Sequence, residues 1–520
     1  MSATDAAHRW NSIISLATLG TNRAQSAPDW PSEDLPLPAG TTERTLLRAA
    51  AVSYLRQISG TRIAPVAIAP EEPAPTVEGK LVSENAAWRL ARMLNGEHRN
   101  LVPEWFALAA RGGWVLPPHW LPVVLDRLQV GERVSATPVL GQRAVWLANR
   151  NPEWKVSGDA HQPSEERWVN GTLAERRLEL AAMRAIDPAA ARTWLQGTWQ
   201  TDPPDARAAF LETILQAPGL SDLDEPFLES ALDDKRKDVR TAAVECLCRL
   251  PSSALARRNL ERLDPLVTLD AQSGGLLGKL KKRRLTIRLP DTLDKASVRD
   301  GVSAKPPAQH KIGERAYWLM QMVSMASPAH WCERFNCDIE TFLDAALATD
   351  YATDLLLALC EAARRHRNAQ WIKALCNRLL LGPDEVESQD IARRILPTMI
   401  VAAPTESRDA ILGQLLGAAR AHQIDLLQPA LIAGEVGWSA DTTQRAFKLL
   451  EELAMEETHS GAVVRITFAD WGSRADVPTA AVAMNRLLSR CSDQSPWRNA
   501  LEKLNASIEF RTAIRQELLT

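Results

Sequence analysis

The stretch from Asp224 to Pro251, which reads DEPFLESALDDKRKDVRTAAVECLCRLP, decides the fold. Apolar residues recur in it at helical spacing, in two runs that a turn of five polar residues separates. The first run is Phe227, Leu228, Ala231 and Leu232, and the second is Val239, Ala242, Ala243, Cys246, Leu247 and Leu250. Two short helices with one apolar face each must stack on similar pairs, because they cannot cover both faces alone. The stretch therefore predicts one unit of an all-α solenoid.

Four positions in this stretch resemble the pattern of a HEAT repeat. That pattern has a proline early in the first helix, an aspartate eight residues later, a valine five beyond it and then an arginine. Pro226, Asp234, Val239 and Arg240 meet all four spacings. The resemblance implies a structural role for Asp234 and Arg240, as members of a polar ladder that links successive repeats.

A weaker copy of the second helix lies upstream, at Asp205 to Leu215, with the sequence DARAAFLETIL. Arg207 corresponds to Arg240, at an offset of 33 residues. The aspartate of the inter-helix turn is missing from this copy. Degenerate copies of this kind are typical of repeat arrays.

The same helical periodicity continues along the chain, in segments about three turns long. In the first half the predicted helices span residues 41–58, 83–94, 103–111, 117–128, 173–186, 188–199 and 204–216. In the second half they span residues 353–367, 371–381, 388–401, 406–421, 441–455, 478–490 and 496–505. In the helix at 41–58, one face carries Leu47, Ala50, Ala51, Tyr54, Leu55 and Ile58. Short polar turns between helices favour antiparallel neighbours, so we expect a solenoid of HEAT-like antiparallel helix pairs.

Three segments interrupt this pattern. Residues 27–40 and 64–79 are rich in proline and predict extended loops. Residues 269–312 contain a basic run, and also the alternating piece LTIRLP, which favours a short β-strand. We therefore predict an N-terminal helical lobe at 1–268, an irregular insert at 269–312 and a C-terminal helical lobe at 313–520.

Composition limits the class of protein. Of the 520 residues, 45% are hydrophobic and 24% are charged, which is typical of a folded chain. The 61 basic and 64 acidic residues nearly cancel, so no global field attracts nucleic acid or anionic lipid. Seven scattered cysteines do not form a disulfide framework, and no apolar run reaches the ~18 residues of a membrane span. We expect thiols and a cytoplasmic location.

A wider resemblance covers the chain from about Leu140 to its end. It rests on the strings VLGQRAVWLANRNPEW, GTLAERRLELAAMRAIDPAAARTWL, FLESALDDKRKDVRTAA, LTIRLPDTLDKASVRDG and GERAYWLMQMVSMASPAHW. These strings resemble an uncharacterised bacterial family of HEAT-like helical-repeat proteins. The resemblance implies that the protein accompanies MoxR-type AAA ATPases and von Willebrand factor A domain proteins. It implies no catalytic residues and no cofactor.

The insert and the residues after it contain the candidate interaction surface. The surface consists of Lys279, Lys281, Lys282, Arg283, Arg284, Arg299, Asp300, Glu314 and Arg315. The run from Lys279 to Arg284 favours a solvated or partner-binding loop, and nucleic acid is the alternative. For the other four residues, the alternative is an ion-pair network that holds the insert to the second lobe, because arginine binds carboxylates with two hydrogen bonds.

His330, Cys332 and Cys337 lie close in sequence but lack the second ligand pair that a structural zinc site needs. We therefore expect no metal, and core thiols instead. No recognisable catalytic set of side chains occurs either, so the sequence predicts no enzyme.

Two classes of function remain. The first is a non-catalytic adaptor whose curved surface, studded with tryptophan and arginine, binds other proteins. Many of the 17 tryptophans fit a place in the core equally well. The second is a nucleic-acid-binding protein that resembles the HEAT-like alkylpurine DNA glycosylases, for which Asp470 beside Trp471 is the pair to nominate. The near-zero net charge argues against the second class.

Overall fold

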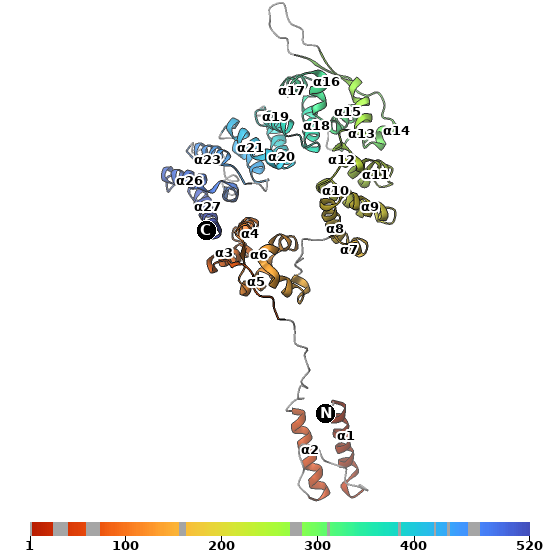
Figure 1. Cartoon of the computed structure of the whole chain (residues 1–520), viewed down its shortest axis with the longest axis vertical. Helices are drawn as coiled ribbons and strands as arrows, with labels where there is room; N and C mark the ends of the chain where they lie inside the picture. The colour runs from red at the N-terminus through yellow and green to blue at the C-terminus, as the bar shows by residue number, and fades with distance from the viewer. Residues whose placement is uncertain are drawn as a thin grey trace, which may run out of the picture. The chain divides into compact units, whose positions relative to one another are not determined.

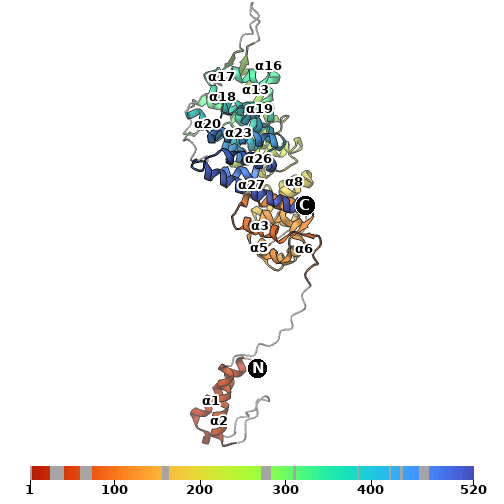
Figure 2. The same cartoon turned by 90° about the vertical axis from the view of Figure 1, so that its left-hand side faces the viewer.

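The computed structural model describes residues 3–23, 40–58, 73–154, 163–270, 283–308, 312–382, 386–420, 423–433, 437–455 and 468–519. The chain divides into two compact units, Met1–Pro73 and Ala74–Thr520. Both units are helical, which confirms the predicted all-α fold (Figures 1 and 2). Most of the two predicted proline-rich loops lies outside the described residues, and residues 73–79 have no regular structure. None of the described helices has the length and apolar character needed to cross a membrane.

The first unit is a helical hairpin. Helix α1 (Ala3–Leu19) leads through the 3-10 turn η1 (Thr21–Arg23) to helix α2 (Thr42–Ile58). Ile13, Leu46 and Ala49 are its buried apolar residues. The hydroxyl of Thr21 in η1 donates to Glu43 of α2 at 2.7 Å. The hairpin therefore has a very small core of its own.

The second unit begins with a small helical subdomain that has its own core. Its elements are β1 (Lys80–Leu81), α3 (Glu84–Leu94), η2 (Arg99–Leu101), α4 (Val102–Arg111), β2 (Trp114–Val115), η3 (Pro118–Trp120), α5 (Leu121–Arg127), α6 (Val130–Ala148) and η4 (Pro152–Trp154). Strands β1 and β2 pair in parallel. Gly141, at a φ of 71°, interrupts α6 in a conformation that residues other than glycine rarely adopt.

A row of helix pairs follows. Its first elements are α7 (Glu165–Asn170), α8 (Leu173–Ile186), α9 (Pro188–Thr198), α10 (Pro204–Gln216), η5 (Asp222–Asp224), α11 (Glu225–Ala231), α12 (Lys237–Cys248), α13 (Ala254–Leu263) and η6 (Asp264–Leu266). Their starts follow local rules: Thr172 caps α8 in a reciprocal bond with Glu175, and Pro188 begins α9. The pair α11 and α12 comes from the stretch of sequence that predicted the fold.

The predicted insert contains a two-stranded antiparallel sheet. Strand β3 (Val267–Leu269) pairs with β4 (Leu285–Ile287), with Thr268 opposite Thr286. Strand β4 is the piece of sequence for which a strand was expected. The short helix α14 (Lys295–Arg299) ends the regular structure of the insert.

The row continues to the C-terminus. Its remaining elements are α15 (Glu314–Met325), α16 (Ala329–Phe335), α17 (Ile339–Leu347), α18 (Ala352–Arg365), α19 (Ala369–Leu380), α20 (Val386–Ala402), α21 (Thr405–Ala418), α22 (Ile424–Ala433), α23 (Ala440–Met455), η8 (Phe468–Asp470), α25 (Trp471–Arg474), α26 (Val477–Arg490) and α27 (Arg498–Leu519). One hydrophobic core includes residues from Trp168 to Ile508. This core includes residues on both sides of the insert. The predicted division of the chain into lobes that end at 268 and begin at 313 remains a prediction.

Helices of the row stack in two layers. In one layer α8 packs on α10 and α10 on α12, and further along α15 packs on α18 and α20 on α22. In the other layer α19 packs on α21, α21 on α23 and α23 on α26. Figure 1 shows α10, α12, α18 and α20 on the inner side of the row, with α9, α11, α17 and α21 on its outer side. The unit is thus an α-solenoid.

Arginine side chains connect neighbouring helices at their C-terminal ends. Arg249 donates to the carbonyl oxygen of Leu215 at 2.7 Å, and Arg365 donates to that of Ser324 at 3.0 Å. The last carbonyl groups of a helix have no partner within it, and they lie at the negative end of its dipole. A guanidinium group therefore satisfies a backbone acceptor and joins two repeats with the same bond.

The C-terminal helix α27 belongs to both cores of the second unit. Its first half contributes Leu504 and Ile508 to the core of the row, and its second half contributes Ile514 and Leu518 to the core of the α3–α6 subdomain. Glu104 of α4 forms ion pairs with two arginines of α27, Arg511 and, at 3.0 Å, Arg515. The indole N–H of Trp114 donates to the carbonyl oxygen of Leu518 at 2.9 Å. The α3–α6 subdomain is therefore packed on the last helix of the solenoid.

Candidate protein-binding groove

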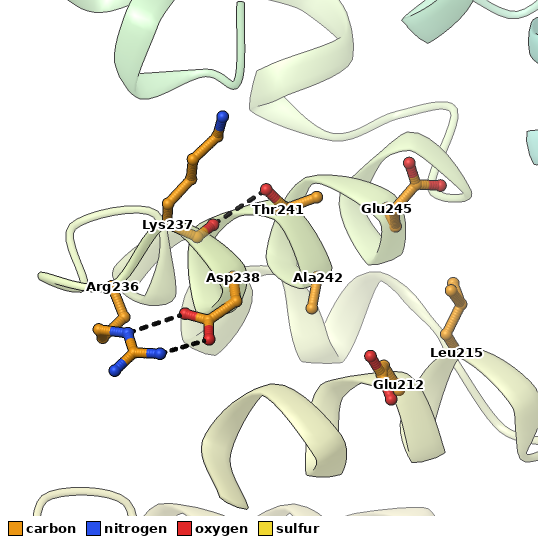
Figure 3. Close-up of a pocket in the computed structure, with 8 residues that line it drawn as sticks. All are labelled: Glu212, Leu215, Arg236, Lys237, Asp238, Thr241, Ala242 and Glu245. Carbon is orange, nitrogen blue, oxygen red and sulfur yellow. Dashed lines mark hydrogen bonds and ion pairs between the residues drawn. The ribbon is translucent and has the colours of Figure 1, made fainter. Parts of the chain in front are cut away.

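A groove with a volume of about 580 Å³ lies between α10 and α12, on the inner layer of the solenoid. Its lining residues are Glu212, Leu215, Arg236, Lys237, Asp238, Thr241, Ala242 and Glu245. Figure 3 shows Arg236 and Lys237 at one end of the groove, and Glu212 and Glu245 towards the other. The groove thus has a basic end and an acidic end.

The amphipathic pattern of α12 places these side chains. Its apolar residues Val239, Ala243 and Leu247 are buried in the stack. Lys237, Thr241 and Glu245 recur every four residues and therefore share another face of the helix. Ala242 also lines the groove, and its side chain is a single methyl group, so it leaves space between α10 and α12.

At the basic end, one cation is neutralised and another is not. Arg236 forms ion pairs with Asp238 at 3.0 Å and with Asp205 at 3.3 Å. The hydrogen bond from Arg236 lowers the pKa of Asp238 below its ordinary value. The exposed Lys237 makes no ion pair within the part of the chain that the structure describes. Its ammonium group can therefore bind a carboxylate of another molecule.

At the acidic end, Glu245 connects the groove to α18. It lies 2.8 Å from Arg365 and 3.8 Å from Arg364. Glu212, on α10, is exposed and has no ion pair among the described residues. Because Glu245 is already paired with the half-buried Arg365, Glu212 is the acid that can accept an external cation.

The polar ladder lies beside this groove. Asp234, in the turn before α12, forms an ion pair with Arg207 of the preceding helix pair at 3.0 Å. Arg240 donates to the carbonyl oxygens of Asp234 at 2.7 Å and of Lys235 at 3.0 Å, within its own pair. Pro226 lies in the first turn of α11, and Val239 is fully buried. The inter-repeat bond of the ladder therefore involves Asp234 and Arg207.

The upstream copy does have a turn aspartate, which corrects the sequence reading. Asp202 forms an ion pair with Arg176 of α8 at 2.7 Å, and its carbonyl oxygen accepts from Arg207 at 2.7 Å. Asp202 precedes its arginine by five residues, whereas Asp234 precedes Arg240 by six. A turn that is one residue shorter hid this aspartate from a comparison at fixed spacing.

Arg299 and Asp300 lie in an ion-pair network, but it holds the insert to the helices before it. Arg299 binds Asp233 at 2.6 Å, and the buried Asp300 binds Arg258 at 2.7 Å and Arg262 at 2.8 Å. Burying a carboxylate costs solvation free energy, and the ion pairs with two arginines compensate for that cost. These two residues are therefore anchors of α14 on α11 and α13, and not a free surface.

The other predicted surface residues have different places. Arg315 binds Asp291 at 2.5 Å and so holds α15 to the insert, while Glu314 is exposed beside it. Arg283 donates to the carbonyl oxygen of Phe335 at 2.9 Å, and the exposed Arg284 follows it in the chain. Lys279, Lys281 and Lys282 lie outside the described residues.

The remaining candidates have structural partners. His330 lies 2.7 Å from Asp264, and no three metal-binding side chains come together in the described ranges. Burial raises the pKa of the Cys332 thiol to about 11. Trp471 is fully buried, so its ring cannot stack on a base, and the exposed Asp470 accepts through its backbone from Ser473.

Tryptophan serves the core more than the surface. Trp105, Trp168, Trp331, Trp371, Trp471 and Trp497 are all buried. These six therefore belong to the core, which is the alternative that the sequence leaves open for many of the tryptophans. The groove residues Glu212, Lys237 and Glu245 were missed because polar residues on the open face of a helix usually mean only solvation.

The fold is that of an all-helical protein whose helices stack as an α-solenoid. The chain belongs to a family of unknown function, DUF5691, whose model matches residues 12–518. No curated protein and no solved structure matches the chain.

Proposed function

We propose that this protein is a non-catalytic scaffold that holds other proteins, and that the groove between α10 and α12 binds a peptide segment of a partner. The observation that carries the proposal is the pair of unneutralised charges at its two ends, Lys237 and Glu212. A segment with an acidic residue at one end and a basic residue at the other would complement both. Between them, Leu215 and Ala242 offer a small apolar floor.

The identity of the partners extends this proposal. We take the helix pairs as HEAT-like, from the spacing of Pro226, Asp234, Val239 and Arg240. Resemblance to the bacterial helical-repeat family suggests a MoxR-type AAA ATPase and a von Willebrand A domain protein as partners. The seven free cysteines suit a reducing compartment, so we place the protein in the cytoplasm.

The test is a tagged pull-down from the native cell with wild-type protein and the double variant Lys237→Glu/Glu212→Lys. This variant exchanges the groove charges and leaves the net charge unchanged. A matched control is Lys448→Glu/Glu452→Lys, which exchanges an exposed ion pair on α23. We expect stoichiometric recovery of an AAA ATPase, and a loss of at least about tenfold in the groove variant only.

Two results would contradict the proposal. One is equal recovery of every partner by the wild-type protein and the groove variant. The other is micromolar binding of duplex or single-stranded DNA that weakens steeply with salt, which would favour the nucleic-acid class instead.

A further inference from the structure

Two of the seven cysteines lie at the C-terminal end of helix α16, where the chain turns towards α17 (Figure 1). Cys332 belongs to the helix, and Cys337 follows its last residue, Phe335, by two positions. Both cysteines are half-buried, whereas the other five are buried. These two are therefore the thiols that a small reagent in solution can reach.

The way in which α16 ends brings the two side chains together. Asn336 has a left-handed conformation, with a φ of 45°, which asparagine adopts more readily than most residues. The chain folds back there, and the backbone N–H of Cys337 donates to the carbonyl oxygen of Cys332 at 3.2 Å. In a helix ending of this type, the side chains of the two residues so bonded commonly touch. Here both side chains are thiols, and Cys332 donates a hydrogen bond to the sulfur of Cys337.

The surroundings make the two thiols unequal. Burial raises the pKa of Cys332 to about 11, and the hydrogen bond that it donates favours its protonated form. Burial raises the pKa of Cys337 too, but the positive charge of Arg283 and the hydrogen bond from Cys332 oppose that rise. Arg283 is fixed beside the pair by its bond to the carbonyl oxygen of Phe335, at 2.9 Å. Because the thiolate is the nucleophile in thiol chemistry, Cys337 is the thiol that reacts first.

A second pair of cysteines shows the importance of access. Cys360 and Cys376 also lie near each other, on the packed helices α18 and α19. Their exposed fractions are 2% and 0%, and burial raises the pKa of Cys376 to about 12. Thiols of this kind are inert, because they form little thiolate and a reagent cannot approach them. The two pairs therefore differ in access and not in proximity.

We propose that Cys332 and Cys337 form a reversible disulfide bond when the glutathione around the protein becomes oxidised. This modification site is independent of the proposed scaffold function. In a reducing compartment the pair rests as two thiols, and the disulfides that do form there are usually transient and redox-sensing.

The reaction is two successive thiol–disulfide exchanges. The thiolate of Cys337 attacks one sulfur of oxidised glutathione, so that a mixed disulfide forms and one glutathione thiolate leaves with the proton that Cys337 lost. Cys332 then loses its proton and attacks the Cys337 sulfur of the mixed disulfide. The protein disulfide forms, and the second glutathione leaves as a thiol. Two protein thiols are thus oxidised, while one molecule of oxidised glutathione is reduced to two thiols.

The test uses the full chain, first reduced and then equilibrated without oxygen at a series of ratios of oxidised to reduced glutathione. The remaining thiols are blocked with N-ethylmaleimide in denaturant, and the chain is cut after glutamate. Cys332 and Cys337 then fall in separate peptides, residues 315–333 and 334–340, with one cysteine each. We expect mass spectrometry to find these peptides joined, with the loss of two hydrogen atoms, and to find them separate after treatment with dithiothreitol.

The chain contains its own matched control. Cys360 and Cys376 should be recovered as blocked thiols at every glutathione ratio that joins Cys332 to Cys337, because both are buried.

Two variants assign the order of attack. Cys332→Ser should accumulate the mixed disulfide of Cys337 with glutathione, because the thiol for the second exchange is missing. Cys337→Ser should form a mixed disulfide at Cys332 at least about tenfold more slowly, because Cys332 is the weaker acid. Each change replaces one sulfur with oxygen at a half-buried position, so the circular dichroism spectrum should match that of the wild type.

Several results would overturn the proposal. One is the absence of the joined peptides at every glutathione ratio, and another is glutathione on both Cys332 and Cys337 of the same chain. A disulfide between two copies, seen as a dimer on a non-reducing gel, would also contradict it. Oxidation of Cys360 and Cys376 to the same extent would show that access does not select the pair. Equal rates in the two single variants would overturn the assignment of Cys337 as the first nucleophile.

Discussion

Helices α2 and α12 are both amphipathic, yet they bury very different amounts of apolar surface. Helix α12 has 12 residues and buries Val239, Ala242, Ala243, Val244, Cys246, Leu247 and Cys248. Helix α2 has 17 residues, and its buried apolar residues are Leu46 and Ala49. The longer helix is the less buried one, so burial depends on the neighbours of a helix and not on its length.

The difference in burial predicts a difference in how much each helix contributes to the stability of the fold. A helix of three or four turns is marginal in water by itself, and most of its stability comes from packing. Helix α12 packs on α10 and α11, while α2 has α1 as its packed neighbour in the hairpin. We therefore expect changes in the stacked region to cost much stability and changes on the open face of α2 to cost little.

The largest expected effect is at the buried ion pair of Asp224. Asp224 binds Arg184 at 2.9 Å with both side chains almost fully buried, and it also binds Arg192. Replacing Asp224 with alanine leaves Arg184 buried without its carboxylate, which should cost about 3–5 kcal/mol of unfolding free energy. Urea titration followed by tryptophan fluorescence measures this cost.

Asp291→Ala is the control for that experiment. Asp291 pairs with Arg315 but its side chain is 89% exposed, so its loss should cost at most about 1 kcal/mol. Equal costs for the two variants would show that stacking does not bury the ion pair of Asp224 and Arg184.

The next effect compares one leucine from each region. Leu247→Ala in α12 should cost about 2–5 kcal/mol, because the residue is fully buried in the stack. Leu47→Ala on α2 should change the unfolding free energy by no more than about 0.5 kcal/mol, because the side chain is 70% exposed. A cost at Leu47 close to that at Leu247 would mean that the face of α2 is covered within the free chain.

A smaller effect is expected at the ladder. Asp234→Ala removes the carboxylate that binds Arg207, at a cost of about 1.5–3 kcal/mol for a charged hydrogen bond. A double-mutant cycle with Arg207→Ala should return a coupling energy of at least about 0.5 kcal/mol. Additive costs would show that the pair does not connect the two repeats.

The smallest effect is a dependence of stability on pH in the stacked region. Burial lowers the pKa of His366 below its ordinary value of 6.5, and its Nε2 lies 3.1 Å from the carbonyl oxygen of Met325. As pH falls through about 6.5, the unfolded chain binds a proton more readily than the folded chain, so unfolding becomes easier. We expect the free energy of unfolding to fall between about pH 7 and pH 5, and less steeply in His366→Gln.

If the free energy of unfolding of His366→Gln depended on pH as steeply as that of the wild type, His366 would not be the cause of the dependence. Burial also lowers the pKa of His98, so the variant should retain part of the wild-type slope.

Much of the fold was predictable because its signal is local. The periodicity at 41–58 and 173–186 predicted α2 and α8 to within a residue or two, since apolar spacing is a property of one helix. The piece LTIRLP predicted β4 from alternation alone. Helices α15, α16 and α17 were not among the predicted helices, although Phe342 and Leu343 of α17 are part of the core.

Long-range features could not be read from the sequence. Helix α27 was predicted to end at Asn505 but continues to Leu519, and the added turns carry Arg511 and Leu518, which pack on α3–α6. A contact between residues about 400 positions apart, such as that of Trp114 with Leu518, produces no periodic pattern in a single sequence. The same holds for the groove, because Glu212 and Lys237 line its two ends only when α10 and α12 stack.

The most direct test of this account is amide hydrogen exchange across the whole chain, read by mass spectrometry. We predict that α2 exchanges at least about 100-fold faster than α12 in the free protein, since local stability follows burial. Equal protection of α2 and α12 in the free chain would contradict the claim that stacking neighbours supply the stability of these helices.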